Sequence, residues 1–533
     1  MRKTDVKSNE EKNATKSSRI PVKPVYTPED LGDWDYHEQL GDPGQYPFTR
    51  GMPLVKRKEG PQEGGQYAGF GTPEATNKWF KYLLSQGSQS LSAALDLPTQ
   101  IGYDSDHPFA LGEVGKQGVS VNSLADMETM LDSIPIEKMG IGSVVSSIGA
   151  IFMAWNIALN QKKGIPIQEM HLTIQNDCLK EFMCRGTQIF PIRPSVKFNC
   201  DAVEYCVRNK IKYASPLTVC GSHMRQAGAS VIQEIAFTIA DAIVFYEDLL
   251  GRGLDVDDFA PYFSVFLGSG MDLFEEICRI RAFRRMWART MKERFGCKTP
   301  PRVISSVNGR HFTAQQPLNN IIRGVIMLLG GALAGIPGGT VRSYDEALAL
   351  PSAEAVRVAL RTQQIVALET GIFNTSDPLG GSYFVEALTD ELEARAGELF
   401  QKVEDMGGAI PALEQGFQQM EIARSAYEKQ LEIETGERVV VGINKYVTDE
   451  PLKIQIMKVD PEEERRQVEK VKKLRRQRDN AAVKAGLKQL KEAAQEGVNM
   501  VPVLVDVVKT YATIGEMCDT LRSVWGEYKP SGL

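Results

Sequence analysis

Two stretches of the sequence place polar side chains directly after short apolar runs. Residues 171–185 (HLTIQNDCLKEFMCR) begin with the alternation of a β-strand and continue with the spacing of a helix. Residues 216–228 (PLTVCGSHMRQAG) repeat this pattern. Because α/β proteins bind ligands at the ends of strands, Gln175, Arg185 and His223 are candidates for binding a small anionic molecule.

Each candidate also has a purely structural interpretation. A lone histidine such as His223 is more often a hydrogen-bonded core residue than a catalytic one. Arg185 lies four residues after Glu181 and is well spaced to pair with it on one helix. Its planar guanidinium equally suits a ligand carboxylate. The matching positions of Gln175 and His223 at two strand ends favour the functional interpretation.

Other chemistries lack their motifs. The five histidines form no HExxH or Cys/His cluster, so no protein-bound metal is expected. The sequence has no P-loop, no GxGxxG after a strand and no GxSxG, which argues against nucleotide-binding loops and a serine hydrolase. The net charge of −6 argues against nucleic-acid binding. The apolar run at 324–339 is interrupted by glycines and a proline and is too short for a membrane span.

The cysteines and the N-terminal residues indicate the compartment. Eight cysteines without a CxxC pair suit a reducing environment. Residues 1–20 are polar and mixed in charge, without the apolar core of a secretory signal. We therefore expect a cytoplasmic protein with a disordered tail of about 20 residues. Residues 21–66 are rich in Pro, Gly and charge and predict an extended arm.

Short β-rich runs alternate with helical patterns through the middle of the chain. Such alternation predicts parallel strands with crossover helices. About eight units over roughly 320 residues favour a closed (β/α)8 TIM barrel over an open sheet. The predicted parts are an N-terminal arm at 1–60, a barrel at 61–385 and a helical C-terminal region at 386–533. The expected strands are 90–97, 141–147, 169–174, 215–220, 262–267, 302–307 and, weakly, 336–341, and the expected helices are 123–133, 148–162, 177–188, 224–250, 271–295, 313–330 and 352–369.

Beyond residue 385 the strand pattern stops. Residues 387–434 are predicted to be helical, and residues 461–495 form a highly charged helix. The ordinary interpretation of that charge is a solvated helix face. The alternative is a docking surface for a partner subunit.

The sequence resembles a known enzyme family from about Tyr46 to Tyr446. Motifs that stand in family order include YPFTRG, QYAGFGTPE, LSAALDLPTQIGYDSDHP, TIQNDCLKEFM, TAQQPLNNIIR, DPLGGSYFVE and VVGINKY. They resemble the adenosylcobalamin-dependent acyl-CoA mutases, specifically the large subunits of methylmalonyl-CoA mutase and isobutyryl-CoA mutase. The resemblance implies a (β/α)8 barrel that threads an acyl-CoA through its centre, with a cobalamin-binding domain over its open face.

The resemblance also implies roles for individual residues. His223 is similar to the histidine that hydrogen-bonds the thioester carbonyl, and Gln175 and Thr173 resemble a substrate-contacting pair. Tyr67 and Arg185 resemble the pair that holds a substrate carboxylate. Because an unpaired buried guanidinium is costly, their retention implies a dicarboxylic substrate. Further substrate-binding candidates are Ser92, Ser222 and Ser264, and the cofactor-binding candidates are Glu346, Gly309, Ala349, Leu95, Gln117, Cys184 and Arg185.

The implied cofactor is adenosylcobalamin. Its radical chemistry belongs to the cofactor, and the protein supplies binding, orientation and exclusion of water. The family's cobalamin signature, DxHxxG, is missing, because the nearest match at 35–41 (DYHEQLG) has its glycine one residue late. We therefore expect a separate small subunit to carry the cobalamin and ligate the cobalt, in a heterotetramer with this chain.

Departures from the family pattern bear on the substrate. Ser222 stands where the family has a bulky tyrosine, which predicts a wider pocket. The family's coenzyme A grip is replaced, and Lys56–Lys58 (KRK) are the candidates to remake it. The preferred function is interconversion of a substituted succinyl-CoA and a substituted malonyl-CoA, with an alkyl or aryl substituent larger than methyl. The alternatives are methylmalonyl-CoA mutase proper and a non-catalytic scaffold relative, which the shortened loops at 304–310 and 338–347 favour.

Overall fold

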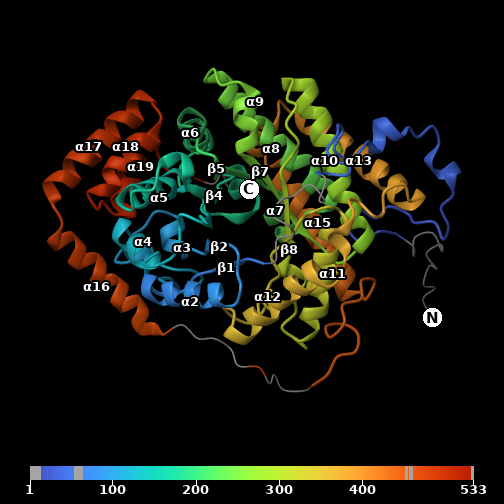
Figure 1. The fold of residues 1–533 in the computed structure, drawn as a ribbon, viewed down its shortest axis with the longest axis horizontal. Coiled ribbons are helices and arrows are strands. Elements are labelled where there is room, and N and C mark those ends of the chain that lie inside the picture. The colour runs from blue at the N-terminus through green and yellow to red at the C-terminus, as the bar shows by residue number, and fades with distance from the viewer. Residues whose placement is uncertain (1–13, 53–63, 450–453, 455–459, 530–533) are drawn as a thin grey trace.

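The computed structural model describes residues 14–52, 64–449, 454 and 460–529. Short parallel strands lie at the centre of the molecule and helices surround them (Figure 1). The last four helices lie on one side of the strands, and the N-terminal arm lies on the other. The predicted coenzyme A grip at Lys56–Lys58 falls outside the described residues.

The named strands form two sheets in which every pairing is parallel. Neighbours in each sheet are also neighbours in sequence, as expected when each strand is followed by a crossover helix. The first sheet contains β1 (Gln66–Ala68), β2 (Leu91–Ala93), β3 (Ile141–Val144), β4 (His171–Gln175) and β5 (Tyr213–Ser215), and the second contains β6 (Leu217–Cys220), β7 (Phe263–Ser269) and β8 (Val303–Val307).

The two sheets form one continuous series. Pro216 separates β5 from β6, because proline has no N–H to donate to the ladder, and β4 also packs against β6. At the outer edges, Val307 N donates to the carbonyl of Thr340 (3.1 Å), and the Gln66 side chain on β1 donates to the carbonyl of Val341 (3.4 Å). The predicted α/β fold class, with parallel strands in a TIM-barrel-like arrangement, is thus confirmed. The segment predicted as a weak strand at 336–341 is irregular.

The helices around the strands follow the predicted alternation. Most begin at a capping side chain: Thr72 accepts a hydrogen bond from Ala75 N at the start of α2, and Ser230 forms a capping box with Gln233 at the start of α8. The helices are α2 (Pro73–Ser85), α3 (Leu97–Gln100), α4 (Leu124–Met130), α5 (Gly149–Lys162), α6 (Ile192–Asn209), α7 (Gly221–Ala227), α8 (Val231–Gly251), α9 (Val256–Phe259), α10 (Leu273–Phe295), α11 (Asn319–Leu333) and α12 (Ala353–Leu368), with short helical turns at η1 (Pro28–Leu31), η2 (Tyr36–Leu40), η6 (Glu181–Arg185) and η8 (Gly309–His311).

The C-terminal region is helical, as predicted. Helix α13 packs against α8 and α10, and α18 packs against α5. This second contact explains why α5 is apolar on all faces, since strands cover one side of it and α18 the other. The helices are α13 (Tyr383–Asp405), α14 (Ala409–Glu414), α15 (Phe417–Glu434), α16 (Pro461–Gln477), α17 (Asn480–Glu496), α18 (Met500–Lys509) and α19 (Ile514–Trp525).

Three predicted helices are interrupted. The helix expected at 177–188 is reduced to the π-helical turn η6, which ends at Gly186 with a φ of 83°. The helix expected at 224–250 divides into α7 and α8, because Gly228 has a φ of 121° and Ser230 starts a new cap. The charged helix expected at 461–495 divides where Asp479 caps α17.

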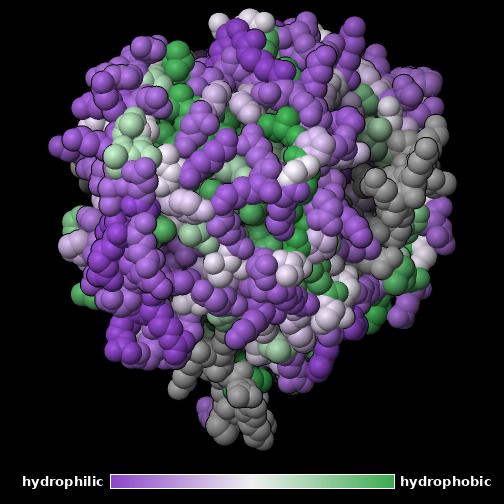
Figure 2. Space-filling view, turned by 60° about the vertical axis from the view of Figure 1, so that its left-hand side comes forward, coloured by the Kyte–Doolittle hydropathy of each residue, from purple (hydrophilic) through white to green (hydrophobic). Residues whose placement is uncertain are grey.

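Helix α16 uses part of its charge within the chain. Glu463 accepts a hydrogen bond from Thr72 N (3.1 Å), and Lys470 pairs with Glu74 (2.6 Å). Arg475 pairs with Asp104 (2.5 Å) and with Asp106 (2.6 Å). Figure 2 shows the side on which α16–α19 lie, and it is mostly hydrophilic with smaller hydrophobic patches. The role of this region in docking a subunit stays a prediction.

The start of the described N-terminal arm contacts the helices near the second sheet. Ser18 donates to Glu275 on α10 from its backbone N (2.6 Å) and its hydroxyl (2.5 Å). The backbone N of Lys16 donates to Asp272 (2.8 Å). None of the helices in the described ranges is long and apolar enough to cross a membrane.

Candidate active site

The strands enclose a cavity of about 750 Å³, most of whose lining side chains lie on them or just beyond their carboxyl ends. Small-molecule pockets typically measure roughly 300–1,000 Å³. The lining combines amide, hydroxyl and charged groups with apolar side chains such as Phe266 and Ile304. The predicted site residues that line it are Tyr67, Ser92, Gln117, Thr173, Gln175, Cys184, Arg185, His223 and Glu346.

The other predicted site residues lie behind or beside this lining. Leu95 is fully buried in the hydrophobic core. The buried hydroxyl of Ser264 hydrogen-bonds with Ser215 (2.9 Å) and Thr218 (2.7 Å), which ties neighbouring strands together. Ser222 is also buried, and its hydroxyl has no hydrogen-bond partner among the described residues.

Two predicted cofactor neighbours lie near the edge of the cavity. Gly309 is beside Glu346, since a Cβ added at Gly309 would lie 3.5 Å from Glu346 Cγ. Ala349 is half-buried three residues after Glu346, in a turn where its N donates to the carbonyl of Asp345 (3.2 Å).

His223 and Gln175 converge on one sulfur atom. Helix α7 begins directly after β6, which places His223 in the first turn beyond the strand. His223 Nδ1 lies 3.4 Å from Cys220 Sγ, and Gln175 Nε2 lies 3.2 Å from the same atom. Gln175 Oε1 is buried and has no donor among the described residues. These two side chains therefore form one polar group at the ends of β4 and β6.

Burial keeps His223 neutral. It lowers the pKa of this imidazole well below its usual range, and the charges of Lys180 and Arg185 lower it further. Burial also raises the pKa of the Cys220 thiol to about 12, so the sulfur keeps its proton. His223 and Cys220 are therefore both neutral hydrogen-bonding groups near pH 7.

Arg185 forms the ion pair that the sequence allowed. Its NH1 donates to Glu181 (3.0 Å) and Thr187 (3.0 Å), and its NH2 donates to Gln100 (2.6 Å). Glu181 also pairs with Lys180, and both of those side chains are fully buried. Burial alone would raise the pKa of Glu181, but Lys180 and Arg185 lower it well below its usual range. The Arg185 side chain remains 21% exposed and lines the cavity.

Tyr67 and Arg342 complete the charged part of the cavity. Burial raises the pKa of the Tyr67 hydroxyl, and the positive charges of Arg185 and Arg342 partly offset this. The Arg342 guanidinium carbon lies 5.9 Å from the centre of the Tyr67 ring. Its Nε lies 3.9 Å from Glu346 Oε1, which is too long for a hydrogen bond.

The residues at the cavity edge fit the adenosyl part of the implied cofactor. Glu346 is 33% exposed, and its carboxylate accepts no hydrogen bond that the structure shows from the described residues, so hydroxyl donors such as those of a ribose can reach it. Gly309 leaves space beside it. Within the described ranges, no group of three His, Cys, Asp or Glu side chains is arranged to hold a metal ion.

Sequence reasoning missed several residues that position this site. Cys220 contacts both Gln175 and His223, Lys180 neutralises Glu181, and Arg342 contributes a second cation. The available signal was spacing, because Cys220 lies three residues before His223, and Arg342 lies four residues before the predicted Glu346.

Comparison with known proteins identifies the family. A sequence profile of the methylmalonyl-CoA mutase family matches residues 15–527. The chain therefore belongs to this family, whose named members are mutases, a class of isomerase.

Individual relatives share about two-fifths of their residues with this chain. It is 40% identical to the 2-hydroxyisobutanoyl-CoA mutase large subunit of Aquincola tertiaricarbonis, over 96% of the chain and 92% of that protein. It is 39% identical to the methylmalonyl-CoA mutase of Cereibacter sphaeroides, over 96% of the chain and 72% of the relative. The mitochondrial methylmalonyl-CoA mutase of Homo sapiens is 38% identical, with 96% and 68% covered.

Proposed function

We propose that this chain is the large subunit of an adenosylcobalamin-dependent mutase that interconverts a substituted succinyl-CoA and the corresponding substituted malonyl-CoA. The observation that carries the proposal is that Tyr67, Arg185 and His223 line one cavity. The cavity thereby combines a neutral hydrogen-bonding end with a cationic end. A dicarboxylic acyl-CoA has the matching pair of groups, a thioester carbonyl and a free carboxylate.

In this proposal His223, Gln175 and Thr173 bind the thioester end. His223 is neutral and can hydrogen-bond the carbonyl without placing a charge beside it. Gln175 has a buried Oε1 without a partner in the described ranges, so it can also meet a donor on the ligand. Cys220 fixes both side chains in place. Ser92 lines the same cavity from β2.

Tyr67 and Arg185 bind the free carboxylate. The Arg185 side chain keeps Nε–H and one N–H of NH2 beyond the hydrogen bonds it makes to Glu181, Thr187 and Gln100. Its existing contacts hold the guanidinium in position, so little side-chain entropy is lost on binding. A substrate without the carboxylate would leave these donors desolvated and unpaired.

When bound, adenosylcobalamin would supply radical chemistry at this site. We assign the adenosine ribose to Glu346, with Gln117 and Cys184 also facing the cavity. Gly309, Ala349 and Leu95 remain proposed neighbours of the cofactor behind this edge. The chain's own contribution is to orient both partners and to exclude water from them.

The proposal includes a substituent larger than methyl. Ser222 is buried and does not line the cavity, so the support for a larger substituent comes from the size of the cavity. The volume of about 750 Å³ leaves room for an alkyl or aryl group. We further propose that a small cobalamin-binding subunit joins this chain in a cytoplasmic heterotetramer. The name of the Aquincola relative, a large subunit that the chain covers almost completely, supports the separate subunit.

Turnover of substrates with different substituents tests the proposal. The chain is combined with its cobalamin-binding subunit and adenosylcobalamin, and turnover is measured with methylmalonyl-CoA, hexylmalonyl-CoA and benzylmalonyl-CoA. We expect a higher kcat/KM for at least one of the larger substrates. Efficient turnover of methylmalonyl-CoA alone would overturn the larger substituent, and turnover of none of them would overturn the function.

A further inference from the structure

We propose that Arg342 is a specificity-determining residue that binds the free carboxylate of the substrate together with Arg185. This inference rests on the proposed dicarboxylic substrate and adds a second cation to it. Arg185 is the last residue of η6, which follows β4, whereas Arg342 comes from the segment after β8. Tyr67 lies on β1. The segment that carries Arg342 contacts β1 at its free edge, whereas β4, which precedes Arg185, lies on the other side of β1 in the sheet.

The surroundings of Arg342 leave its charge available. Its Nε is buried and has no hydrogen-bond partner among the described residues, and its side chain is only 20% exposed. Glu346 is the one carboxylate that the described structure pairs with it, at 3.9 Å. A largely buried guanidinium without a hydrogen-bonded anion is unfavourable, so the site is built to receive one.

Arg185 and Arg342 differ in how far protein groups already neutralise them. Arg185 donates to the buried carboxylate of Glu181 at 3.0 Å. Arg342 has no such short contact in the described ranges, and it faces the Tyr67 ring. Arg185 would therefore orient a ligand carboxylate at Tyr67, and Arg342 would supply most of the positive charge that neutralises it.

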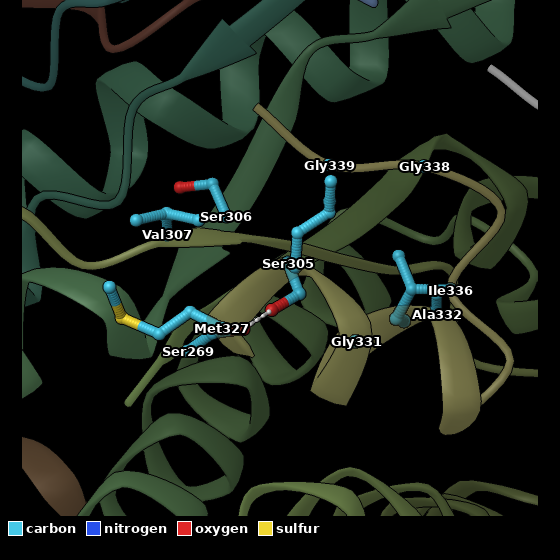
Figure 3. A pocket seen from close by; sticks show the side chains of 11 residues that line it. Ser269, Ser305, Ser306, Val307, Met327, Gly331, Ala332, Ile336, Gly338 and Gly339 are labelled. Carbon is cyan, nitrogen blue, oxygen red and sulfur yellow. Dashed lines mark hydrogen bonds between the residues drawn. The ribbon is translucent and has the colours of Figure 1, made fainter. Parts of the chain in front are cut away.

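The backbone holds Arg342 in place. Thr340 lies two residues before Arg342, and its carbonyl accepts a hydrogen bond from Val307 N on β8 (3.1 Å). A Cβ at Gly339 would lie 2.7 Å from the carbonyl oxygen of Ser305, so the segment packs directly on β8. Figure 3 shows Gly338 and Gly339 crossing beside Ser305, whose hydroxyl hydrogen-bonds to Ser269 (2.7 Å) around a small cavity of about 10 Å³. Arg342 thus extends from a fixed support and not from a free loop.

The test compares ligands with and without the carboxylate. Holoenzyme carrying Arg342→Gln, Arg342→Lys or the exposed control Arg357→Gln is titrated calorimetrically with a hexylsuccinyl-CoA and with the matching acyl-CoA that lacks the free carboxyl group. We expect Arg342→Gln to weaken binding of the carboxylated ligand about ten- to a hundredfold, as for loss of a charged hydrogen bond. Binding of the other ligand should change less than threefold, and Arg342→Lys should recover part of the loss.

Each outcome decides between the roles. An equal loss for both ligands, or no loss for either, would overturn the role of Arg342 in carboxylate recognition. The same titration of Arg185→Gln distinguishes a failure of the Arg342 role from a failure of the proposed dicarboxylic substrate. If Arg185→Gln is selective and Arg342→Gln is not, only the inference about Arg342 fails. If the unmodified holoenzyme does not prefer the carboxylated ligand, the proposed function fails.

Discussion

Replacing Glu181 with glutamine removes a negative charge from a buried position that holds two cations. Glu181 pairs with Lys180 and Arg185, and it accepts hydrogen bonds from the backbone N (3.0 Å) and hydroxyl (2.7 Å) of Thr187. The glutamine keeps the shape but leaves the Lys180 ammonium, whose side chain is fully buried, without its anion. Breaking a buried ion pair in this way costs about 3–5 kcal/mol of unfolding free energy.

The pH dependence of this loss follows from the depressed pKa of Glu181. Burial raises that pKa, and the charges of Lys180 and Arg185 lower it further than burial raises it. A carboxyl with a lowered folded-state pKa stabilises the fold above its unfolded pKa, and this is lost only as the pH falls through the folded value. The difference between Glu181→Gln and the unmodified chain should therefore be constant from pH 8 to about pH 5.5.

Urea unfolding followed by far-ultraviolet circular dichroism measures this difference. The exposed Glu293→Gln variant on α10 is the matched control, and it should remain within about 0.5 kcal/mol of the unmodified chain. A loss below about 1 kcal/mol for Glu181→Gln would show that Lys180 is not paired as described. It would also remove the reason for treating Arg185 as a positioned cation.

Three further changes test other parts of the structure. Cys220→Ala removes the sulfur between Gln175 and His223, and kcat should fall about ten- to a hundredfold. Because the thiol is buried, the free energy of unfolding should also fall, by about 1–3 kcal/mol. An unchanged kcat would contradict this positioning role. His311 has its pKa lowered to about 3 by burial first and by Arg225 next, so its stabilising effect is present at neutral pH and lost as pH falls below its unfolded value. Between pH 7 and pH 5 the free energy of unfolding should fall by up to about 2 kcal/mol more in the unmodified chain than in His311→Gln. Equal falls in the two proteins would contradict the lowered pKa of His311. Gly339→Ala should lower stability by about 1–3 kcal/mol, because its Cβ would lie 2.7 Å from a backbone oxygen, and an unchanged urea midpoint would show that the segment yields.

The sequence predicts most of the strands because their apolar alternation is local. The strands expected at 141–147 and 302–307 are found as β3 and β8. The helix boundaries were less predictable, because backbone conformation decides them. Gly228 and Gly186 adopt positive φ values that end helical segments, while the side-chain spacing continues through both.

The sequence also predicts some residues of the candidate site and not others. Residues within quoted motifs, such as Gln175, Arg185 and His223, lie around one cavity as the strand-end argument predicts. Leu95 belongs to a quoted motif but packs in the hydrophobic core. Ser264 lies on the same side of β7 as the cavity-lining Phe266, but its hydroxyl is used by Ser215 and Thr218 and is buried beneath the lining. Arg342 was not predicted, since its proximity to Tyr67 depends on contacts between segments more than 270 residues apart in sequence.

The proposed substrate of this mutase is a dicarboxylic acyl-CoA. The most direct measurement is kcat/KM of the reconstituted enzyme for hexylmalonyl-CoA and for 2-hydroxyisobutanoyl-CoA, the substrate named in the Aquincola relative. The two arginines at Tyr67 predict a preference of at least tenfold for the malonyl substrate. Equal or faster turnover of 2-hydroxyisobutanoyl-CoA would show that the enzyme does not select for a free carboxylate.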